Sequence, residues 1–312
     1  MIKVDLVTGF LGSGKTTFLK RYAKFLLGRG QRIGILENDY GAVNVDMMLL
    51  RELEGENCGL DMVAGACDAD CHKRRFKTKL IALGMSGYDR VLIEPSGVFD
   101  IDEFFDTLYE PPLDRWYEIG SVIAVVDANL GDDLSDSADY LLASQVAGAG
   151  VVVLSKTQWA TAEEQVATVR HIGSALKKVK CEKSLENRVI AKDWDDLTDS
   201  DFERAMNCGY ESQSFVKRGT TDDSGFGSQY FLNRSFTAEE FAEKAAEAFA
   251  NKDCGDVFRV KGFARDGDGW LECNATRSRT DIRPIDCGQD IVIVIGEKLN
   301  SNIISAIFDR KA

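Results

Sequence analysis

The sequence predicts an α/β protein, in which a doubly wound, mainly parallel sheet is followed by a smaller α+β domain. Strand-like and helix-like stretches alternate from residue 2 to about residue 210, as in a parallel sheet with helices on both faces. Several strand candidates, such as 151–154, are continuous apolar runs, which burial on both faces requires. After a polar stretch at 211–228, a helix precedes several closely spaced strands, a pattern typical of a separate unit.

The elements of the first part are placed by apolar runs and helical periodicity. We expect strands at 4–7, 32–36, 89–94, 121–126, 150–154 and 187–191. We expect helices at 16–28, 72–84, 101–108, 137–147, 161–178 and 199–207. Thr161 and Glu164 have the spacing of a capping box, which defines the start of one of these helices.

The last part of the chain has a different pattern. We expect a helix at 237–250, strands at 256–264, 269–277, 280–286 and 290–296, and a final helix at about 299–310. The stretch Asp266-Gly-Asp-Gly269 predicts a tight hairpin between the first two strands. The predicted domains are 1–210, a linker or flexible loop at 211–228, and 229–312.

A phosphate-binding loop is predicted between the first strand and the first helix. Residues Gly9–Thr16 fit the pattern G-x-x-x-x-G-K-[ST], and apolar residues at helical spacing follow from Phe18. Glycines let successive N–H groups face phosphate oxygens, and the positive end of the helix adds attraction. Lys15 can reach the β- and γ-phosphates, and the Thr16 hydroxyl can bind Mg²⁺. We prefer a P-loop NTPase to a chance glycine-rich turn, with nucleotide contacts from Gly9, Gly12, Ser13, Gly14, Lys15, Thr16 and Thr17.

A second catalytic segment, Glu94-Pro-Ser-Gly97, follows the strand at 89–94. A carboxylate at this place in a phosphate-loop protein can hold Mg²⁺ through water or orient the attacking water. The N–H of Gly97 can contact the γ-phosphate and so respond to its loss. The alternative is an ordinary strand-to-helix turn. The predicted catalytic residues are therefore Lys15, Thr16, Glu94 and Gly97.

Three acidic residues follow the strand at 32–36, namely Glu37, Asp39 and Asp46. Acids beside a phosphate site need a cation or an exposed position. They are candidates for Mg²⁺ or a second metal, and for any single one of them a solvated acidic loop is an equal alternative.

Residues Cys67, Cys71 and His72 form the densest group of soft metal ligands in the chain. Zn²⁺, Co²⁺ or another thiophilic ion prefers thiolate and imidazole ligands. Cys58 is a further candidate ligand. The alternative is a pair of buried thiols at the start of a helix.

The segment Ser155-Lys156-Thr157-Gln158 follows the strand at 150–154. GTPases usually place Asn-Lys-x-Asp here, with the aspartate on guanine and the lysine stem against the base. We therefore expect Lys156 and Gln158 to contact the base. Gln158 accepts one hydrogen bond and donates another, so it offers no charge-assisted bidentate acceptor, and the sequence leaves GTP and ATP both open.

The composition excludes several partners and locations. A formal charge of −13 argues against a nucleic acid or an anionic membrane as the main partner. No apolar run reaches the roughly 18 residues that a spanning helix needs. The chain opens directly into a strand at Ile2, so we expect no signal peptide. Eight cysteines in that context favour reduced thiols and a cytoplasmic location.

Together these motifs resemble the CobW family of phosphate-loop GTPases, relatives of the HypB and UreG nickel-insertion proteins. The phosphate loop Thr8–Thr17 matches almost letter for letter. Glu37-Asn-Asp-Tyr-Gly41 is similar to the family's Asn-Glu-Phe-Gly segment, Asp46 to an acid shortly after it, and Glu94–Gly97 to its Glu-Thr-x-Gly switch. Val122–Asp127, Gln145 and the final 85 residues, including Ile291–Gly296, also resemble the family.

The resemblance implies a nucleotide hydrolase that delivers or inserts a metal, or that activates a metal- or cobalamin-dependent enzyme. The implied partners are a nucleotide with Mg²⁺ and a client metalloenzyme or corrinoid protein, and a homodimer is left open. The chain departs from the family at Cys67-Asp-Ala-Asp-Cys71, where the family has Cys-x-Cys-Cys, at Ala42, at Gln158, and in having no histidine-rich tail.

Intrinsic turnover is expected to be slow, because no obvious arginine finger lies in these motifs. Two alternatives remain at this point: a nucleotide-switched protein-binding module without metal cargo, and a small-molecule kinase.

Overall fold

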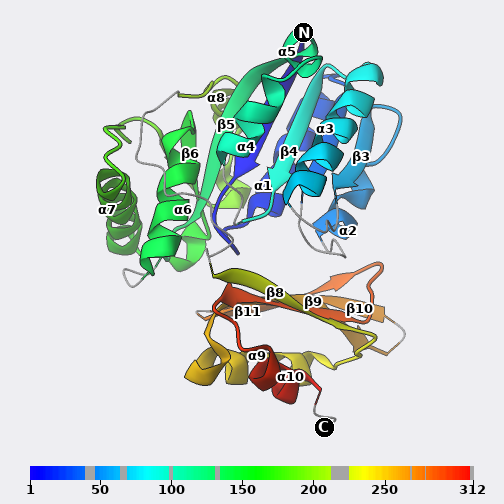
Figure 1. The fold of residues 1–312 in the computed structure, drawn as a ribbon, viewed down its shortest axis with the longest axis vertical. Helices are drawn as coiled ribbons and strands as arrows, with labels where there is room; N and C mark the ends of the chain where they lie inside the picture. The colour runs from blue at the N-terminus through cyan, green and yellow to red at the C-terminus, as the bar shows by residue number, and fades with distance from the viewer. Residues whose placement is uncertain are drawn as a thin grey trace. The chain divides into compact units, whose positions relative to one another are not determined.

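The computed structural model describes residues 1–38, 46–63, 69–97, 101–130, 134–211, 225–267, 269–277 and 279–309, without the side chains at 46, 69, 70, 102 and 103. Contacts divide the chain into two compact units, Met1–Arg218 and Gly219–Ala312. Each unit has its own sheet (Figure 1), and each is described by itself below.

The first unit is built on a seven-stranded sheet in which all neighbouring strands run parallel. From edge to edge the order is β3 (Cys58–Val63), β2 (Ile33–Asn38), β4 (Arg90–Pro95), β1 (Ile2–Thr8), β5 (Tyr117–Asp127), β6 (Val151–Ser155) and β7 (Val189–Ala191). The carboxyl ends of all these strands therefore lie along one edge. This arrangement confirms the predicted doubly wound sheet. The sequence did not predict β3, whose central residues are only half-buried.

Helices cover both faces of this sheet (Figure 1). One face packs against α1 (Lys15–Gly28), α2 (Asp46–Leu50) and α8 (Asp199–Met206). The other packs against α3 (Ala69–Met85), α4 (Ile101–Leu108), α5 (Leu113–Trp116), α6 (Asp136–Ala147) and α7 (Ala162–Lys178). The predicted capping box of Thr161 and Glu164 is confirmed at the start of α7. Single 3-10 turns occur at η1 (Arg51–Leu53), η2 (Thr157–Trp159), η3 (Trp194–Asp196) and η4 (Lys252–Cys254).

A buried polar network joins the central elements of the first unit. Asp5, in β1, is fully buried. It accepts hydrogen bonds from Arg90 Nη1 at 2.6 Å, Tyr22 Oη at 2.6 Å and the Ser121 amide at 2.9 Å. Burial raises the pKa of the Asp5 carboxyl, and the Arg90 charge opposes that rise. The network connects β1, β4, β5 and α1, the elements that hold the phosphate loop.

The second unit is a five-stranded antiparallel sheet packed against two helices. Its order is β11 (Arg279–Ile285), β10 (Gly269–Thr276), β9 (Asp256–Asp266), β12 (Ile291–Glu297) and β8 (Phe226–Leu232). Helices α9 (Ala238–Ala250) and α10 (Ser301–Phe308) share its core. The predicted hairpin between β9 and β10 is confirmed by the pairing of Asp266 with Gly269. The sequence did not predict β8, so residues 226–228 of the expected linker belong to a strand.

Within these described ranges, every helix is too short or too polar to cross a lipid bilayer.

Candidate nucleotide and metal site

The loop between β1 and α1 is shaped by glycines. Gly9, Gly12 and Gly14 have φ angles of +150°, +75° and +91°, a backbone region that side chains with a Cβ rarely adopt. A Cβ at Gly9 would lie 2.1 Å from the carbonyl oxygen of Val125, in β5. The curl of the predicted phosphate loop is therefore set by the backbone of the neighbouring strand.

The side chain of Lys15 lies over this loop. Its Nζ donates a hydrogen bond to the Gly9 carbonyl oxygen at 3.1 Å, and the residue is only 7% exposed. Lys15 is also the first residue of α1, a helix of 14 residues whose free N–H groups point toward the loop. Backbone amides, a helix N-terminus and an ammonium group thus converge at one place, which is the donor set that a polyphosphate requires.

Oxygen ligands gather on the β4 side of the loop. Thr16 Oγ1 donates a hydrogen bond to Glu94 Oε1 at 2.8 Å. Glu37, in β2, is the register partner of Glu94, in β4, and both residues are buried. Strand alternation puts both side chains on the sheet face that α1 covers, because Ile35 and Leu92 pack there. Hydroxyl and carboxylate oxygens are the ligands that Mg²⁺ prefers, and a cation relieves the repulsion between two buried carboxylates. The residues therefore fit Mg²⁺.

Gly97 lies directly against the phosphate loop. A Cβ at Gly97 would be 2.7 Å from the backbone nitrogen of Leu11. Its carbonyl oxygen accepts a hydrogen bond from Gln145 Nε2, in α6, at 3.0 Å. The amide of Ser96 donates to the Asn38 carbonyl oxygen at 2.8 Å, which ties the same turn to β2. The turn after β4 is thus placed next to the phosphate loop, as the sequence predicted for Glu94 and Gly97.

The residues predicted to contact the base lie on the other side of the loop. Lys156 has a positive φ of 57° and donates from Nζ to Asp127 Oδ2 at 2.5 Å. Gln158, in η2, is exposed. The position of a Cβ on Gly14 would be 3.6 Å from Ser155 Cβ and 3.6 Å from Trp194 Cζ2. The loops after β6 and β7 therefore border the phosphate loop.

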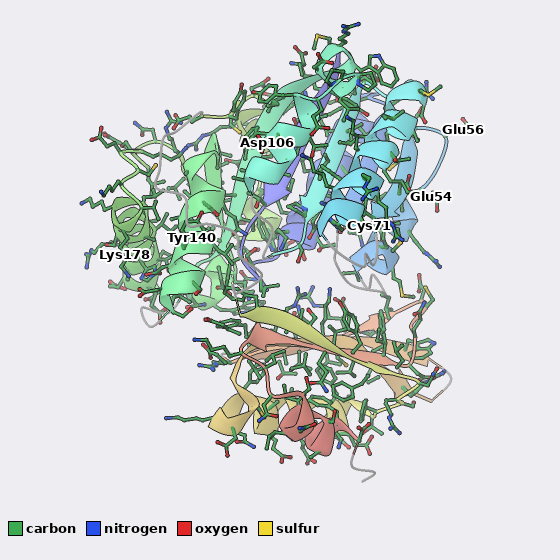
Figure 2. All side chains as sticks on the ribbon, viewed as in Figure 1. Glu54, Glu56, Cys71, Asp106, Tyr140 and Lys178 are labelled. Atoms are coloured by element: carbon green, nitrogen blue, oxygen red, sulfur yellow. The ribbon has the colours of Figure 1, made fainter. Side chains whose placement is uncertain are left out.

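The predicted thiophilic metal site lies only partly within the described residues. Cys71 and His72 stand in the first turns of α3, where Figure 2 labels Cys71. Cys71 is partly exposed and His72 is buried. Among the side chains that the structure describes, no three His, Cys, Asp or Glu residues form a metal-binding group. Cys67, Asp39 and the side chain of Asp46 lie outside the described residues.

The position of Cys58 at the start of β3 argues against its joining Cys71 at a metal. Cys58 is the first residue of β3, whereas α3 follows the end of that strand. A six-residue strand separates its two ends by about 17 Å. Burial raises the pKa of the Cys58 thiol to about 11, which disfavours the thiolate that a metal needs.

Sequence reasoning missed Leu11, Trp194 and the role of Gln145 at this site. Trp194 follows β7 closely, so a search after every strand of the sheet would have found it. The contact between Leu11 and Gly97 has no local signature, because it depends on how two loops approach in space.

Comparisons with known proteins give a consistent picture. A family model described as CobW/HypB/UreG, nucleotide-binding domain, matches residues 3–184. The chain is 29% identical over 174 residues to the zinc chaperone YeiR of Escherichia coli, an alignment covering 54% of this chain and 51% of that protein. It is 30% identical over 173 residues to the zinc chaperone YjiA of Escherichia coli, covering 53% and 52% respectively. The zinc-bound crystal structure of the YjiA GTPase aligns over 99% of both chains, with 20% identity and a TM-score of 0.39.

The chain spans about half the length of these curated relatives. The family model covers more than half of this chain and includes the phosphate loop, the turn at Glu94–Gly97 and the segment Ser155–Gln158. Since this family model matches more than half of the chain, the chain belongs to the CobW/HypB/UreG family of nucleotide-binding domains.

Proposed function

We propose that this protein is a Mg²⁺-dependent nucleoside triphosphate hydrolase that delivers a thiophilic divalent metal to a client metalloenzyme or corrinoid protein. The observation that carries the hydrolase proposal is the hydrogen bond between Thr16 and Glu94, formed beside the glycine-curled loop that Lys15 covers. The names of the relatives, zinc chaperones YeiR and YjiA, support zinc as the cargo.

In the proposed reaction, loop amides and the Lys15 ammonium bind the phosphate oxygens and stabilise the charge that develops on the transferring phosphoryl group. Thr16 and Glu94 would hold Mg²⁺, with Glu37 beside them, and the bound ion would neutralise charge on the β- and γ-phosphates. The Gly97 amide would contact the γ-phosphate, so loss of that phosphate would release the turn after β4.

The metal would be cargo rather than a resident cofactor. Cys71 and His72 lie near the start of α3, the helix that follows β3, and together with Cys67 they would supply the soft ligands that Zn²⁺ prefers. Coupling between the nucleotide and the cargo would pass through the turn at Gly97 and the segment after β2, which includes Asp39 and Asp46. GTP and ATP are both candidate nucleotides.

The hydrolase proposal is tested by Lys15→Ala in the full chain. Binding of a fluorescent GTP or ATP analogue with Mg²⁺ should weaken on the order of 10–100-fold, because a charge-assisted hydrogen bond of about 1.5–3 kcal/mol is lost. The matched control is Lys20→Ala on the same helix, where the lysine pairs with Glu52 at the surface. Equal nucleotide affinity in Lys15→Ala and the wild type would overturn the proposal.

The cargo proposal is tested separately, by Cys67→Ser combined with Cys71→Ser. The reduced double variant should lose stoichiometric Zn²⁺ and Co²⁺ binding in competition with a chromophoric chelator, while nucleotide affinity stays the same. Cys287→Ser, in the second unit, controls for loss of a partly exposed thiol. Undiminished metal binding in the double variant would reject the site. Absence of metal binding in the wild type would leave a nucleotide-switched protein-binding module.

A further inference from the structure

The two sides of the phosphate loop differ in chemistry. Toward β4 and β2 lie the oxygens of Thr16, Glu94 and Glu37. Toward β6 and β7 lie Ser155 and the indole of Trp194, both next to Gly14. If nucleotide binds as proposed, the Mg²⁺ that Thr16 and Glu94 would hold would neutralise charge on the terminal phosphates, so these phosphates would lie on the Thr16 side. The nucleoside must then leave the loop toward β6 and β7.

Trp194 is fixed in place beside this exit. Its ring lies 5.8 Å from the Phe18 ring, centroid to centroid. Arg21 Nη1 donates to the Trp194 carbonyl oxygen at 2.8 Å, and Arg21 Nη2 pairs with Asp195 Oδ1 at 2.6 Å. Both attachments come from α1, the helix that begins at the phosphate loop. The tryptophan is only half-buried, so part of the indole is available to a ligand.

Gln158 belongs to the loop that leaves the strand next to β7. Leu154, near the end of β6, is the register partner of Ala191, the last residue of β7. The two loops therefore leave the same edge of the sheet side by side. Lys156 is held by its ion pair with Asp127, and Gln158 follows it in the turn η2. Gln158 is exposed and Trp194 is half-buried, so both side chains can be reached by a ligand.

The amide of Gln158 offers one acceptor and one donor, whereas a carboxylate would offer two acceptors. Guanine presents two donors side by side, the N1–H and the 2-amino group, so the donor of Gln158 would face another donor. Hypoxanthine presents the N1–H next to a C–H, and xanthine presents the N1–H next to a carbonyl oxygen. The donor–acceptor pair of Gln158 is therefore complementary to xanthine and to adenine, whose N6–H donor lies beside the N1 acceptor, neutral toward hypoxanthine and mismatched to guanine.

We propose that Trp194 and Gln158 form the nucleoside subsite of this protein. The indole is the aromatic contact for the nucleoside, and the Gln158 amide pairs with the edge of a purine base without preferring a 2-amino group. This inference rests on the proposed nucleotide binding. It assigns a substrate class that is broader than guanine nucleotides and that includes the triphosphates of xanthosine, inosine and adenosine.

Base selection is tested by displacing a ribose-labelled fluorescent nucleotide with unlabelled GTP, ITP, XTP and ATP. The wild type should bind XTP and ITP at least as tightly as GTP. Gln158→Asp should shift the GTP-to-XTP affinity ratio toward GTP on the order of 10–100-fold, since it supplies a second, charged acceptor. The control for the added charge is Gln31→Asp, near the start of β2. A wild type that prefers GTP over both ITP and XTP by about 10-fold or more would overturn the base assignment, as would an unchanged ratio in Gln158→Asp.

The role of Trp194 is tested with a ligand that has no nucleoside. Trp194→Ala should bind nucleoside triphosphates roughly 5–100-fold more weakly, while its affinity for inorganic tripolyphosphate with Mg²⁺ stays the same. Lys15→Ala should weaken both ligands. Loss of tripolyphosphate affinity in Trp194→Ala would show that the tryptophan only supports the loop, and would overturn its assignment as a nucleoside contact. A wild type without tripolyphosphate or nucleotide affinity would instead reject the proposed function.

Intrinsic fluorescence gives a second readout with a milder variant. Nucleotide should change the tryptophan emission of the wild type, and Trp194→Phe should remove most of that change. Trp116 is the last residue of α5 and directly precedes the start of β5, whereas the phosphate loop follows the carboxyl end of β1. Trp116→Phe should therefore retain the nucleotide-dependent change in emission. Full retention of the nucleotide-dependent change in Trp194→Phe would contradict contact between the indole and the nucleoside.

Discussion

Gln145 donates a hydrogen bond from Nε2 to the carbonyl oxygen of Gly97 at 3.0 Å. Gln145 is fully buried in α6, and Gly97 lies against Leu11 of the phosphate loop. A helix on the far side of the sheet from α1 thus touches the turn that we propose to respond to the γ-phosphate. If that turn responds to nucleotide as proposed, α6 would connect nucleotide state to the rest of that face.

Replacing Gln145 with glutamate should lower the rate of hydrolysis more than it lowers the affinity for nucleotide. At neutral pH the carboxylate of Gln145→Glu cannot donate to the Gly97 carbonyl, so the turn loses a fixed orientation. We expect the single-turnover hydrolysis rate to fall on the order of 10-fold, the effect of about 1.4 kcal/mol in the barrier. Nucleotide affinity should change much less. Gln145→Asn keeps the donor on a shorter side chain and should retain more activity. A Gln145→Glu variant that hydrolyses at the wild-type rate would contradict this role.

Adding a methyl group at Gly97 should weaken the binding of a nucleoside triphosphate. In Gly97→Ala the new Cβ would meet the Leu11 nitrogen at 2.7 Å, so the two loops must separate. Overpacking of this kind costs about 1–3 kcal/mol. Triphosphate affinity should fall more than diphosphate affinity, measured by isothermal titration with Mg²⁺ present. Gly173→Ala, in α7 with no atom within 4 Å of the added Cβ, is the control and should be neutral. Equal losses for the two ligands would argue against contact between Gly97 and the γ-phosphate.

Removing one partner of the buried ion pair between Asp5 and Arg90 should strongly destabilise the first unit. Arg90→Met leaves the Asp5 carboxylate buried without its cation, which should lower the free energy of unfolding by about 3–5 kcal/mol. Asp5→Asn combined with Arg90→Met removes both charges and should recover part of that loss. Urea unfolding followed by circular dichroism measures both effects. Equal stability of the single and double variants would show that the uncompensated charge of Asp5 is not the cause of the lower free energy of unfolding.

The stability of Arg90→Met should also depend on pH. Burial raises the pKa of Asp5 in the folded state, and loss of Arg90 should raise it further. The folded chain then holds this proton more tightly than the unfolded chain, so the group favours folding at low pH. That contribution is lost as pH rises from the unfolded-state value, near 3.8, through the folded-state pKa. The difference in the free energy of unfolding between Arg90→Met and the wild type should therefore become smaller at pH values below this range. Urea midpoints measured across pH test this.

Glu110 should give a small pH effect of the opposite sign. Hydrogen bonds from Lys77 and then Lys73 lower the pKa of Glu110 from 4.5 to about 2. Its contribution is present above pH 4.5 and is lost as pH falls toward 2. The group is partly exposed, so we expect less than about 1 kcal/mol. Glu110→Gln should lower the melting temperature at pH 7 and not near pH 2, whereas Glu56→Gln at an exposed position should change neither.

Much of the fold could be predicted because strands that are buried on both faces consist mainly of apolar residues, which are recognisable in the sequence. The strands β1, β4, β5 and β6 are apolar runs enclosed on both faces. The edge strands β3 and β8 were missed, since half-buried strands carry polar residues and resemble loops.

The candidate site also contains residues that the sequence predicts and contacts that it does not. Lys15 and Thr16 follow from local spacing, and Glu94 from its place at a strand end. The contacts of Gly97 with Leu11 and of Gly14 with Trp194 join distant segments, so only the folded chain reveals them. The place of Cys58 at the start of β3 argues against it as a ligand of the same metal as Cys71, and the spacing of thiols along the sequence does not show which end of a strand each one occupies. The contributions of Cys67, Asp39 and Asp46 remain predictions.

The close approach of Gly9 to the Val125 carbonyl has a consequence for how this protein tolerates mutation. The atom that limits Gly9 in the proposed phosphate loop is a main-chain oxygen, which every residue type supplies at this position. Substitutions among apolar side chains of β5 should therefore leave phosphate affinity unchanged. A one-residue shift in the register of β5 with β1 would move the Val125 carbonyl and change the shape of the loop at Gly9. The shape of the loop at Gly9 thus depends on the register of β1 and β5 more than on the identity of their side chains.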